Sequence, residues 1–151
     1  MRFLAFTFFF ASFSAMAACP NLAGTYSQCT SATTGEVTNG STVTETTAGG
    51  ITTYTIVSMN EETQTEVTGT LITDGVARTE TLTDEETGMG ISLTTKASCM
   101  GTALMYEGTV EAQGQTIANF VTHVTKSGSK MSSTTTGTSM DETINDTEIC
   151  E

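Results

Sequence analysis

The chain has 151 residues, with seventeen acidic side chains against five basic ones and a formal net charge of −12 at pH 7. This balance excludes a nucleic-acid-binding protein, because affinity for phosphate backbones comes largely from Lys and Arg. It also argues against binding to anionic membrane surfaces. With one histidine the chain lacks a two-histidine metal site, and we expect neither a metal ion nor another cofactor.

The first seventeen residues have the pattern of an export signal. Arg2 precedes the short apolar run FLAFTFFFASF, and small residues follow at positions 15–17. The run is shorter than the roughly 20 apolar residues that span a bilayer. We therefore predict a signal peptide at 1–17, a single domain at 18–151 and an exported protein that is periplasmic or secreted.

Short segments with the composition of β-strands follow one another along the rest of the chain. Thr, Val and Ile favour strands, and no long stretch shows helical periodicity. The dipeptides Asn39-Gly40 and Asp74-Gly75 are typical of two-residue hairpin turns. The predicted strands lie at 22–28, 36–46, 51–59, 65–73, 76–83, 90–98, 103–112, 116–126 and 129–137.

These segments predict an all-β fold in which neighbouring strands pair antiparallel. We expect an up-and-down β-barrel of about eight to ten strands, since closure removes exposed sheet edges. The alternative is a two-sheet β-sandwich. Alternation of apolar and polar residues predicts a barrel interior lined by Tyr54, Ile56, Leu71, Ile91, Leu93, Leu104, Tyr106 and Val110, with His123 as a polar member.

Four cysteines in a short exported chain predict two disulfides, for which three pairings are open. We favour Cys19 with Cys29, which are close in sequence, and Cys99 with Cys150, which would pin the C-terminal tail. In the alternative, MAAC at positions 16–19 is a lipobox and Cys19 carries a lipid anchor. That alternative leaves an odd thiol, and Met16 stands where such signals usually have Leu, so we favour the disulfides.

The segment CPNLAGTYSQC at 19–29 carries a family resemblance. Its Gly-x-aromatic pattern, Gly24 to Tyr26, resembles the Gly-x-Trp opening of the calycins, the lipocalin and fatty-acid-binding-type barrels. It is also similar to the Cys-Pro-x-Leu-x-Gly-x-Tyr opening of small exported proteins of predatory Gram-negative bacteria. The resemblance implies a barrel whose floor is plugged by the aromatic ring. Two features of the family are missing. No late-strand arginine stacks on that ring, and the nearest basic residues, Lys126 and Lys130, lie in predicted turns. The residues that clamp a carboxylate in fatty-acid-binding proteins are also missing.

The function indicated by these features is binding rather than catalysis. His123 would have to carry any Ser-His-Asp relay, and no nucleophile motif accompanies it. We expect a lipocalin-like carrier of a small, partly apolar ligand. The alternative is a secreted or envelope-associated interaction or adhesion domain with a filled barrel. A cavity would favour the carrier, and an exposed apolar patch around Phe120 and Val124 would favour the interaction domain.

Overall fold

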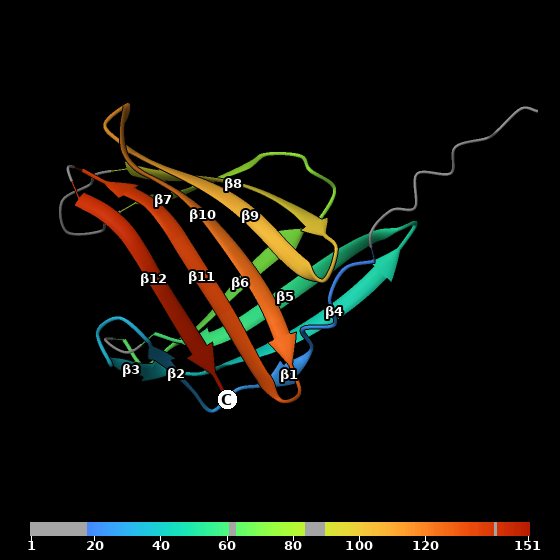
Figure 1. Cartoon of the computed structure of the whole chain (residues 1–151). Coiled ribbons are helices and arrows are strands. Elements are labelled where there is room, and N and C mark those ends of the chain that lie inside the picture. Colours follow the sequence, from blue (N-terminus) through green and yellow to red (C-terminus); the bar gives the residue numbers. More distant parts are fainter. Residues whose placement is uncertain (1–17, 61–62, 84–89, 141) are drawn as a thin grey trace, which may run out of the picture.

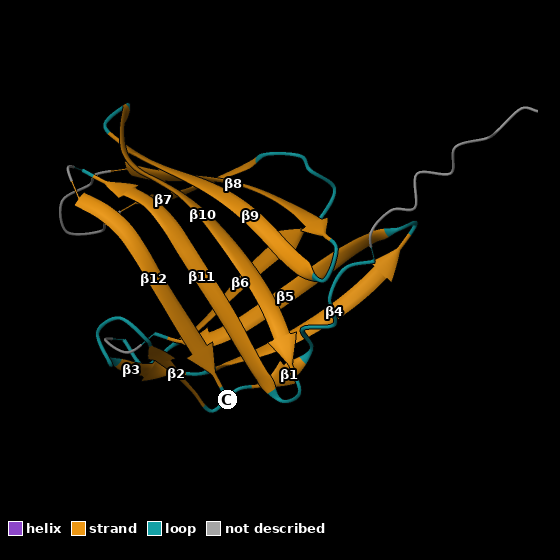
Figure 2. Cartoon of the chain, in the orientation of Figure 1, coloured by secondary structure: helices purple, strands orange, loops and turns teal. Residues whose placement is uncertain are grey.

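The computed structural model describes residues 18–60, 63–83, 90–140 and 142–151, so the predicted signal peptide at 1–17 lies outside the described residues (Figure 1). The described residues form strands, turns and loops, without a helix (Figure 2). Accordingly, none of them belongs to a helix that could cross a membrane. The strands are β1 (Gly24–Thr25), β2 (Gln28–Ser31), β3 (Val37–Asn39), β4 (Ser41–Ala48), β5 (Ile51–Met59), β6 (Glu66–Ile72), β7 (Arg78–Thr83), β8 (Gly90–Met100), β9 (Ala103–Ala112), β10 (Gln115–Ser127), β11 (Lys130–Ser139) and β12 (Glu142–Cys150).

The strands form two antiparallel sheets, which confirms the all-β prediction. One sheet has the order β1-β4-β5-β6, and the other has the order β3-β2-β12-β11-β10-β9-β8-β7. Consecutive strands are neighbours from β4 to β6 and from β7 to β12, as an up-and-down meander requires. In Figure 1 the eight-stranded sheet curves across the four-stranded sheet. The sheets are not closed into a barrel, and the arrangement agrees with the two-sheet sandwich alternative.

The two sheets are joined at a corner where the chain passes from β3 directly into β4. Gly40 lies at this corner, and a Cβ atom added there would stand 1.8 Å from the carbonyl oxygen of Tyr26. The Tyr26 amide donates to the Ser41 carbonyl at 2.8 Å, which ties β1 to the same corner. The predicted hairpin at Asn39-Gly40 is therefore wrong, because β3 and β4 belong to different sheets and do not pair.

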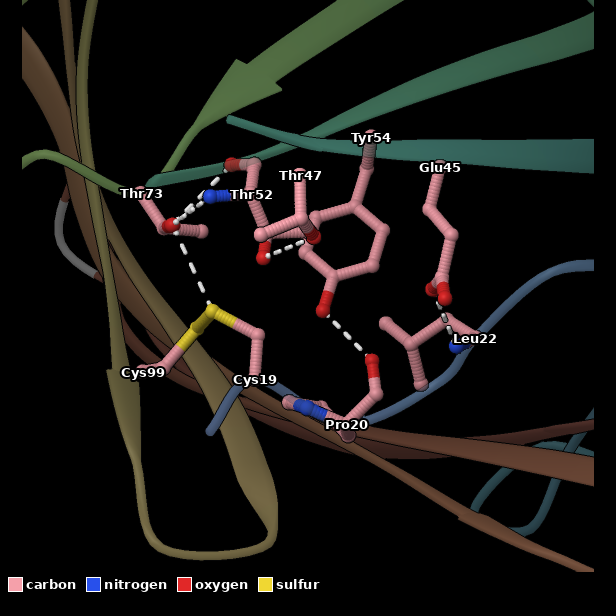
Figure 3. Close-up of a disulfide and its surroundings, with 9 residues drawn as sticks. All are labelled: Cys19, Pro20, Leu22, Glu45, Thr47, Thr52, Tyr54, Thr73 and Cys99. Carbon is pink, nitrogen blue, oxygen red and sulfur yellow. Dashed lines mark hydrogen bonds between the residues drawn. A yellow bond between two sulfur atoms is a disulfide. The ribbon is translucent and has the colours of Figure 1, made fainter. Parts of the chain in front are cut away.

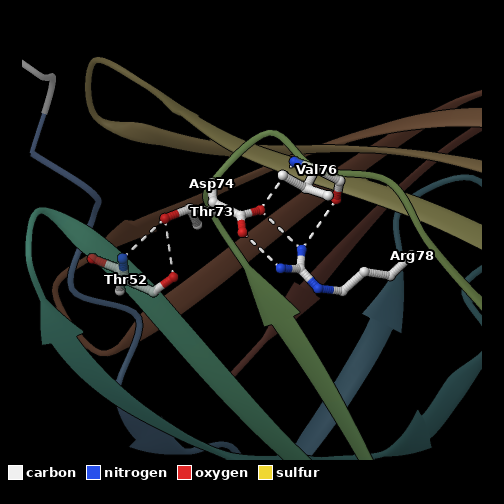
Figure 4. A network of polar contacts seen from close by, with 5 residues as sticks. All are labelled: Thr52, Thr73, Asp74, Val76 and Arg78. Carbon is white, nitrogen blue, oxygen red and sulfur yellow. Dashed lines mark hydrogen bonds and ion pairs between the residues drawn. The ribbon is translucent and has the colours of Figure 1, made fainter.

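On the opposite side, the four-stranded sheet ends at β6 and the eight-stranded sheet ends at β7. The link between them is a turn in which Arg78 binds Asp74 through two hydrogen bonds of 2.6 and 2.9 Å (Figure 4). Hydrogen bonding by this guanidinium holds the pKa of Asp74 well below its usual range. The Gly75 amide also donates to the Ala97 carbonyl of β8 at 3.0 Å.

The predicted hairpin at Asp74-Gly75 is wrong: the turn forms, but β6 and β7 do not pair. We call the interval between the β6 edge of one sheet and the β7 edge of the other the seam.

The last strand, β12, was not predicted from the sequence. Its residues alternate weakly between apolar and polar, as Asn145 and Asp146 beside Thr147 illustrate. The strand forms because β11 and β2 provide hydrogen-bonding partners on both sides. It thereby brings Cys150 directly opposite Cys29, although these residues are 121 positions apart.

Candidate ligand site between the sheets

The disulfides join Cys19 to Cys99 and Cys29 to Cys150, so the favoured pairing was wrong. The reason is the strand order. Cys29 and Cys150 face each other on neighbouring strands, and the N-terminal segment crosses to β8 instead of folding back on β2. The Cys19–Cys99 bond also uses the sulfur that a lipid anchor at Cys19 would require.

The segment 19–26, which we call the strap, runs across one end of the space between the sheets (Figure 3). The Cys19–Cys99 disulfide fixes its first residue to β8. The Tyr54 hydroxyl of β5 donates to the Pro20 carbonyl at 2.5 Å, and the Leu22 amide donates to Glu45 Oε2 of β4 at 3.1 Å. The strap is thus bonded to both sheets and closes this end.

The strap ends at the aromatic residue of the Gly-x-aromatic pattern. Tyr26 is 3% exposed, and its hydroxyl donates to the Leu22 carbonyl at 2.8 Å. Lys126 lies in β10, not in the predicted turn, with Nζ 5.9 Å from the Tyr26 ring centroid. The same Nζ donates to the Ala23 carbonyl at 2.5 Å. A lysine of a late strand therefore lies over the Tyr26 ring.

Tyr54 occupies the centre of the closed end. Its side chain is completely buried, and it faces Glu45 across the β4–β5 ladder. Burial, with a smaller contribution from the negative charge of Glu45, raises the pKa of Tyr54 to about 12. The hydroxyl consequently stays protonated at any physiological pH and remains a donor to the strap.

Around Tyr54, the inward-facing apolar residues of both sheets form the core. Most of the predicted interior set belongs to this face. Leu104 is 2% exposed, and Ile56, Leu71 and Tyr106 pack against the buried residues. The buried apolar residues are Leu22, Tyr26, Cys29, Val43, Tyr54, Ala97, Leu104, Val124 and Cys150. We call this region the near half of the inter-sheet space.

Farther from the strap, the inner face of the eight-stranded sheet is less well covered. Ile91, Leu93, Val110 and Phe120 face inward by strand register, but each remains only half-buried. We call these four residues the far half. On the four-stranded sheet, Val67 of the inner face is 48% exposed. The space between the sheets thus changes from a packed core to accessible apolar surface.

Phe120 is a site residue whose inward orientation the alternation of β10 does not reveal. Its ring lies over Gly108 of β9, where an added Cβ would stand 2.1 Å from the ring. It also contacts Tyr106 edge-on, with ring centroids 6.2 Å apart. A strand glycine directly opposite an aromatic residue is the signal that could have identified this pair. Val124, on the same face, is buried, so these two residues do not form the exposed outer patch that would favour an interaction domain.

His123 does not line the interior. Its neighbours Thr122 and Val124 are buried, so strand alternation turns the imidazole to the outer face, where it is exposed. The prediction failed because β10 carries apolar residues on both faces, and its sequence alone does not show which face is inside. His123 pairs with Met105 and Thr134 of the adjacent strands.

Several surface hollows lie among the described residues, and Phe120 of the far half borders one of them. This hollow, of about 400 Å³, lies against β9, β10 and β11 beside Phe120 and Gly137. Another, of about 780 Å³, lies beside the strap and Lys126. Ile91, Leu93 and Val110 form apolar surface between the sheets and do not line either of these two hollows.

Comparison with known proteins gave no match: no family model, curated protein or solved structure is similar to this chain. The two disulfides indicate a non-reducing, exported environment. Functional inference therefore depends on the geometry of the inter-sheet space.

Proposed function

We propose that this protein is an exported, non-enzymatic binding protein that holds a small, partly apolar ligand between its two sheets. The observation that carries the proposal is the incomplete burial of the far half. Leu93, Val110 and Phe120 face the opposite sheet, yet they remain accessible while Tyr54 and Leu104 at the closed end are fully packed. Apolar surface on the inward side of a sheet is normally covered, and a ligand would cover it here.

The site would recognise its ligand mainly through apolar contact. The edge-on pair of Tyr106 and Phe120 supplies an aromatic wall, and Leu93 and Val110 pair directly on the neighbouring strands β8 and β9. Polar groups at one end of the ligand could bond to Thr95, which lies on the same face of β8. We also propose that the protein is exported, to the periplasm or by secretion, and that it carries its ligand as calycins do.

Binding of the neutral fluorescent probe N-phenyl-1-naphthylamine tests this proposal. A neutral probe is required because the net charge of −12 would repel an anionic one. We expect saturable binding with one probe per chain, and a loss of at least about tenfold in affinity for Leu93→Glu, which places a charge on apolar surface. The adjacent Thr94→Glu is the matched control, since Thr94 faces outward and bonds to Thr79 at 2.7 Å.

Equal loss in both variants would contradict an inter-sheet site. Absence of saturable probe binding by the unmodified protein would also contradict it and would favour the alternative, an interaction or adhesion domain. Circular dichroism of each variant checks that the sheets are retained, so that a folding defect is not mistaken for loss of the site.

A further inference from the structure

The edge of the four-stranded sheet at β6 is unusually open. Residues 66–70 of β6 are exposed on both faces, and no described strand pairs with them on the side away from β5. Nearer the end of the strand, the chain approaches β8 through the Gly75–Ala97 hydrogen bond. The accessible edge is therefore Glu66–Thr70, about the length of an average strand.

The other described edges are shorter or carry charged side chains, as the β4 residues beyond the β1 pairing do with Glu45. β1 has two residues and β3 has three, while β7 carries Arg78 and Glu80. Charged side chains and short lengths are the usual means of preventing strands from pairing between molecules. The β6 edge contains neither Lys, Arg nor Pro, and its only charge, Glu66, stands at one end.

We propose that this edge binds a second copy of the chain, with the two β6 strands antiparallel and a two-fold axis at Thr68. This register places Thr68 opposite the partner's Thr68, Val67 opposite the partner's Gly69 and Glu66 opposite the partner's Thr70. No charge then faces a like charge. Such self-complementarity is what a two-fold interface demands, and opposed like charges would be destabilising.

The fit of Val67 against Gly69 is the most specific part of this register. Val67 is 48% exposed on the inner face, and a Cβ built at Gly69 meets nothing within 4 Å. Each valine would fill the space beside the partner's glycine, on the same side of the joined sheet. Two copies would thereby bury two exposed valines and extend each four-stranded sheet into one of eight strands.

The strong negative charge of the chain favours this edge over other surfaces for self-association. Copies carrying −12 each repel one another, so contact is least costly where charge is absent. Thr68 and Thr70 contribute uncharged side chains on the outer face, continuous with Thr44 and Thr55 through the β4–β5–β6 register. A positively charged partner protein would find one complementary group on this stretch, Glu66 at its end.

A charge-swap experiment tests the axis at Thr68. We expect the unmodified protein to dimerise with concentration in sedimentation velocity and native mass spectrometry. Thr68→Lys and Thr68→Glu should each weaken dimerisation at least about tenfold, because like charges meet at the axis. An equimolar mixture of the two variants should recover a dimer that contains one copy of each. Thr44→Lys, on the same face but away from the edge, should dimerise like the unmodified protein.

Two results would overturn the proposal. A chain that remains monomeric at all concentrations would show that the edge does not bind a second copy, leaving a strand from another protein as the occupant to seek. A dimer that Thr68→Lys and Thr68→Glu leave intact, or a mixture that fails to form the mixed dimer, would place the interface elsewhere. The far-UV spectrum of each variant shows whether the fold is retained.

Discussion

The two halves of the inter-sheet space are built from similar residues but are covered to different extents. In the near half, the strap brings a disulfide, a buried tyrosine hydrogen bond and Leu22 onto the inner faces of both sheets. In the far half, Leu93 and Val110 have the same inward orientation with no such cover. A covalently held segment, rather than the strand sequences, therefore separates packed core from accessible surface.

The largest expected effect comes from removing the disulfide that holds the strap. Replacing both Cys19 and Cys99 by Ser opens a loop with a sequence separation of 80. In the chain-entropy model this lowers the free energy of unfolding by about 4 kcal/mol, measured by urea denaturation. Peptide mapping of the unreduced protein provides the control, and recovery of a Cys19–Cys29 peptide would contradict the observed pairing.

Truncation of one leucine in each half tests the difference in packing directly. Leu104→Ala should lower the free energy of unfolding by about 3 kcal/mol, because it leaves a cavity in the near half. Leu93→Ala should cost about 1 kcal/mol or less, since its side chain is only partly removed from water. Equal costs in chemical denaturation would mean that the two halves are packed alike.

Two glycines near Tyr26 should respond differently to substitution. A Cβ at Gly40 would collide with the Tyr26 carbonyl oxygen, so Gly40→Ala should destabilise the corner by about 2 kcal/mol. A Cβ at Gly24 would meet the Tyr26 ring at 3.5 Å, an ordinary contact. Thermal unfolding should therefore show Gly24→Ala close to the unmodified protein, and a large effect there would contradict the packing around Tyr26.

The hydrogen bond from Tyr54 to the strap should make the near half sensitive to alkali. Its pKa of about 12 in the folded protein lies above the ordinary tyrosine value of 10. Stability from this group is therefore complete below pH 10 and is lost as the pH rises toward 12, because only the unfolded chain ionises in that window. Tyr54→Phe should cost about 1 kcal/mol at neutral pH and remove this part of the alkaline loss. Denaturation at pH 8 and pH 11 measures both effects, with Tyr106→Phe as the control.

The sequence was informative where local chemistry decides the structure. Alternation in segments such as 51–59 and 103–112 correctly predicted strands and placed Tyr54 and Leu104 on inward faces. It failed at β12, whose polar residues become a strand only between β2 and β11, and at His123, whose strand is apolar on both faces. Both failures arise because pairing partners and the identity of the inner face are properties of the whole sheet.

Composition and short-range alternation are enough to indicate an antiparallel all-β chain, its negative surface and two disulfides. The tertiary fold is needed to establish which cysteines join, where the sheets separate at the seam and which apolar residues stay accessible. Cys19 meets Cys99, and Lys126 meets Tyr26, across separations of 80 and 100 positions. Contacts of that range depend on the order in which strands pair, because it is this order that brings distant residues together.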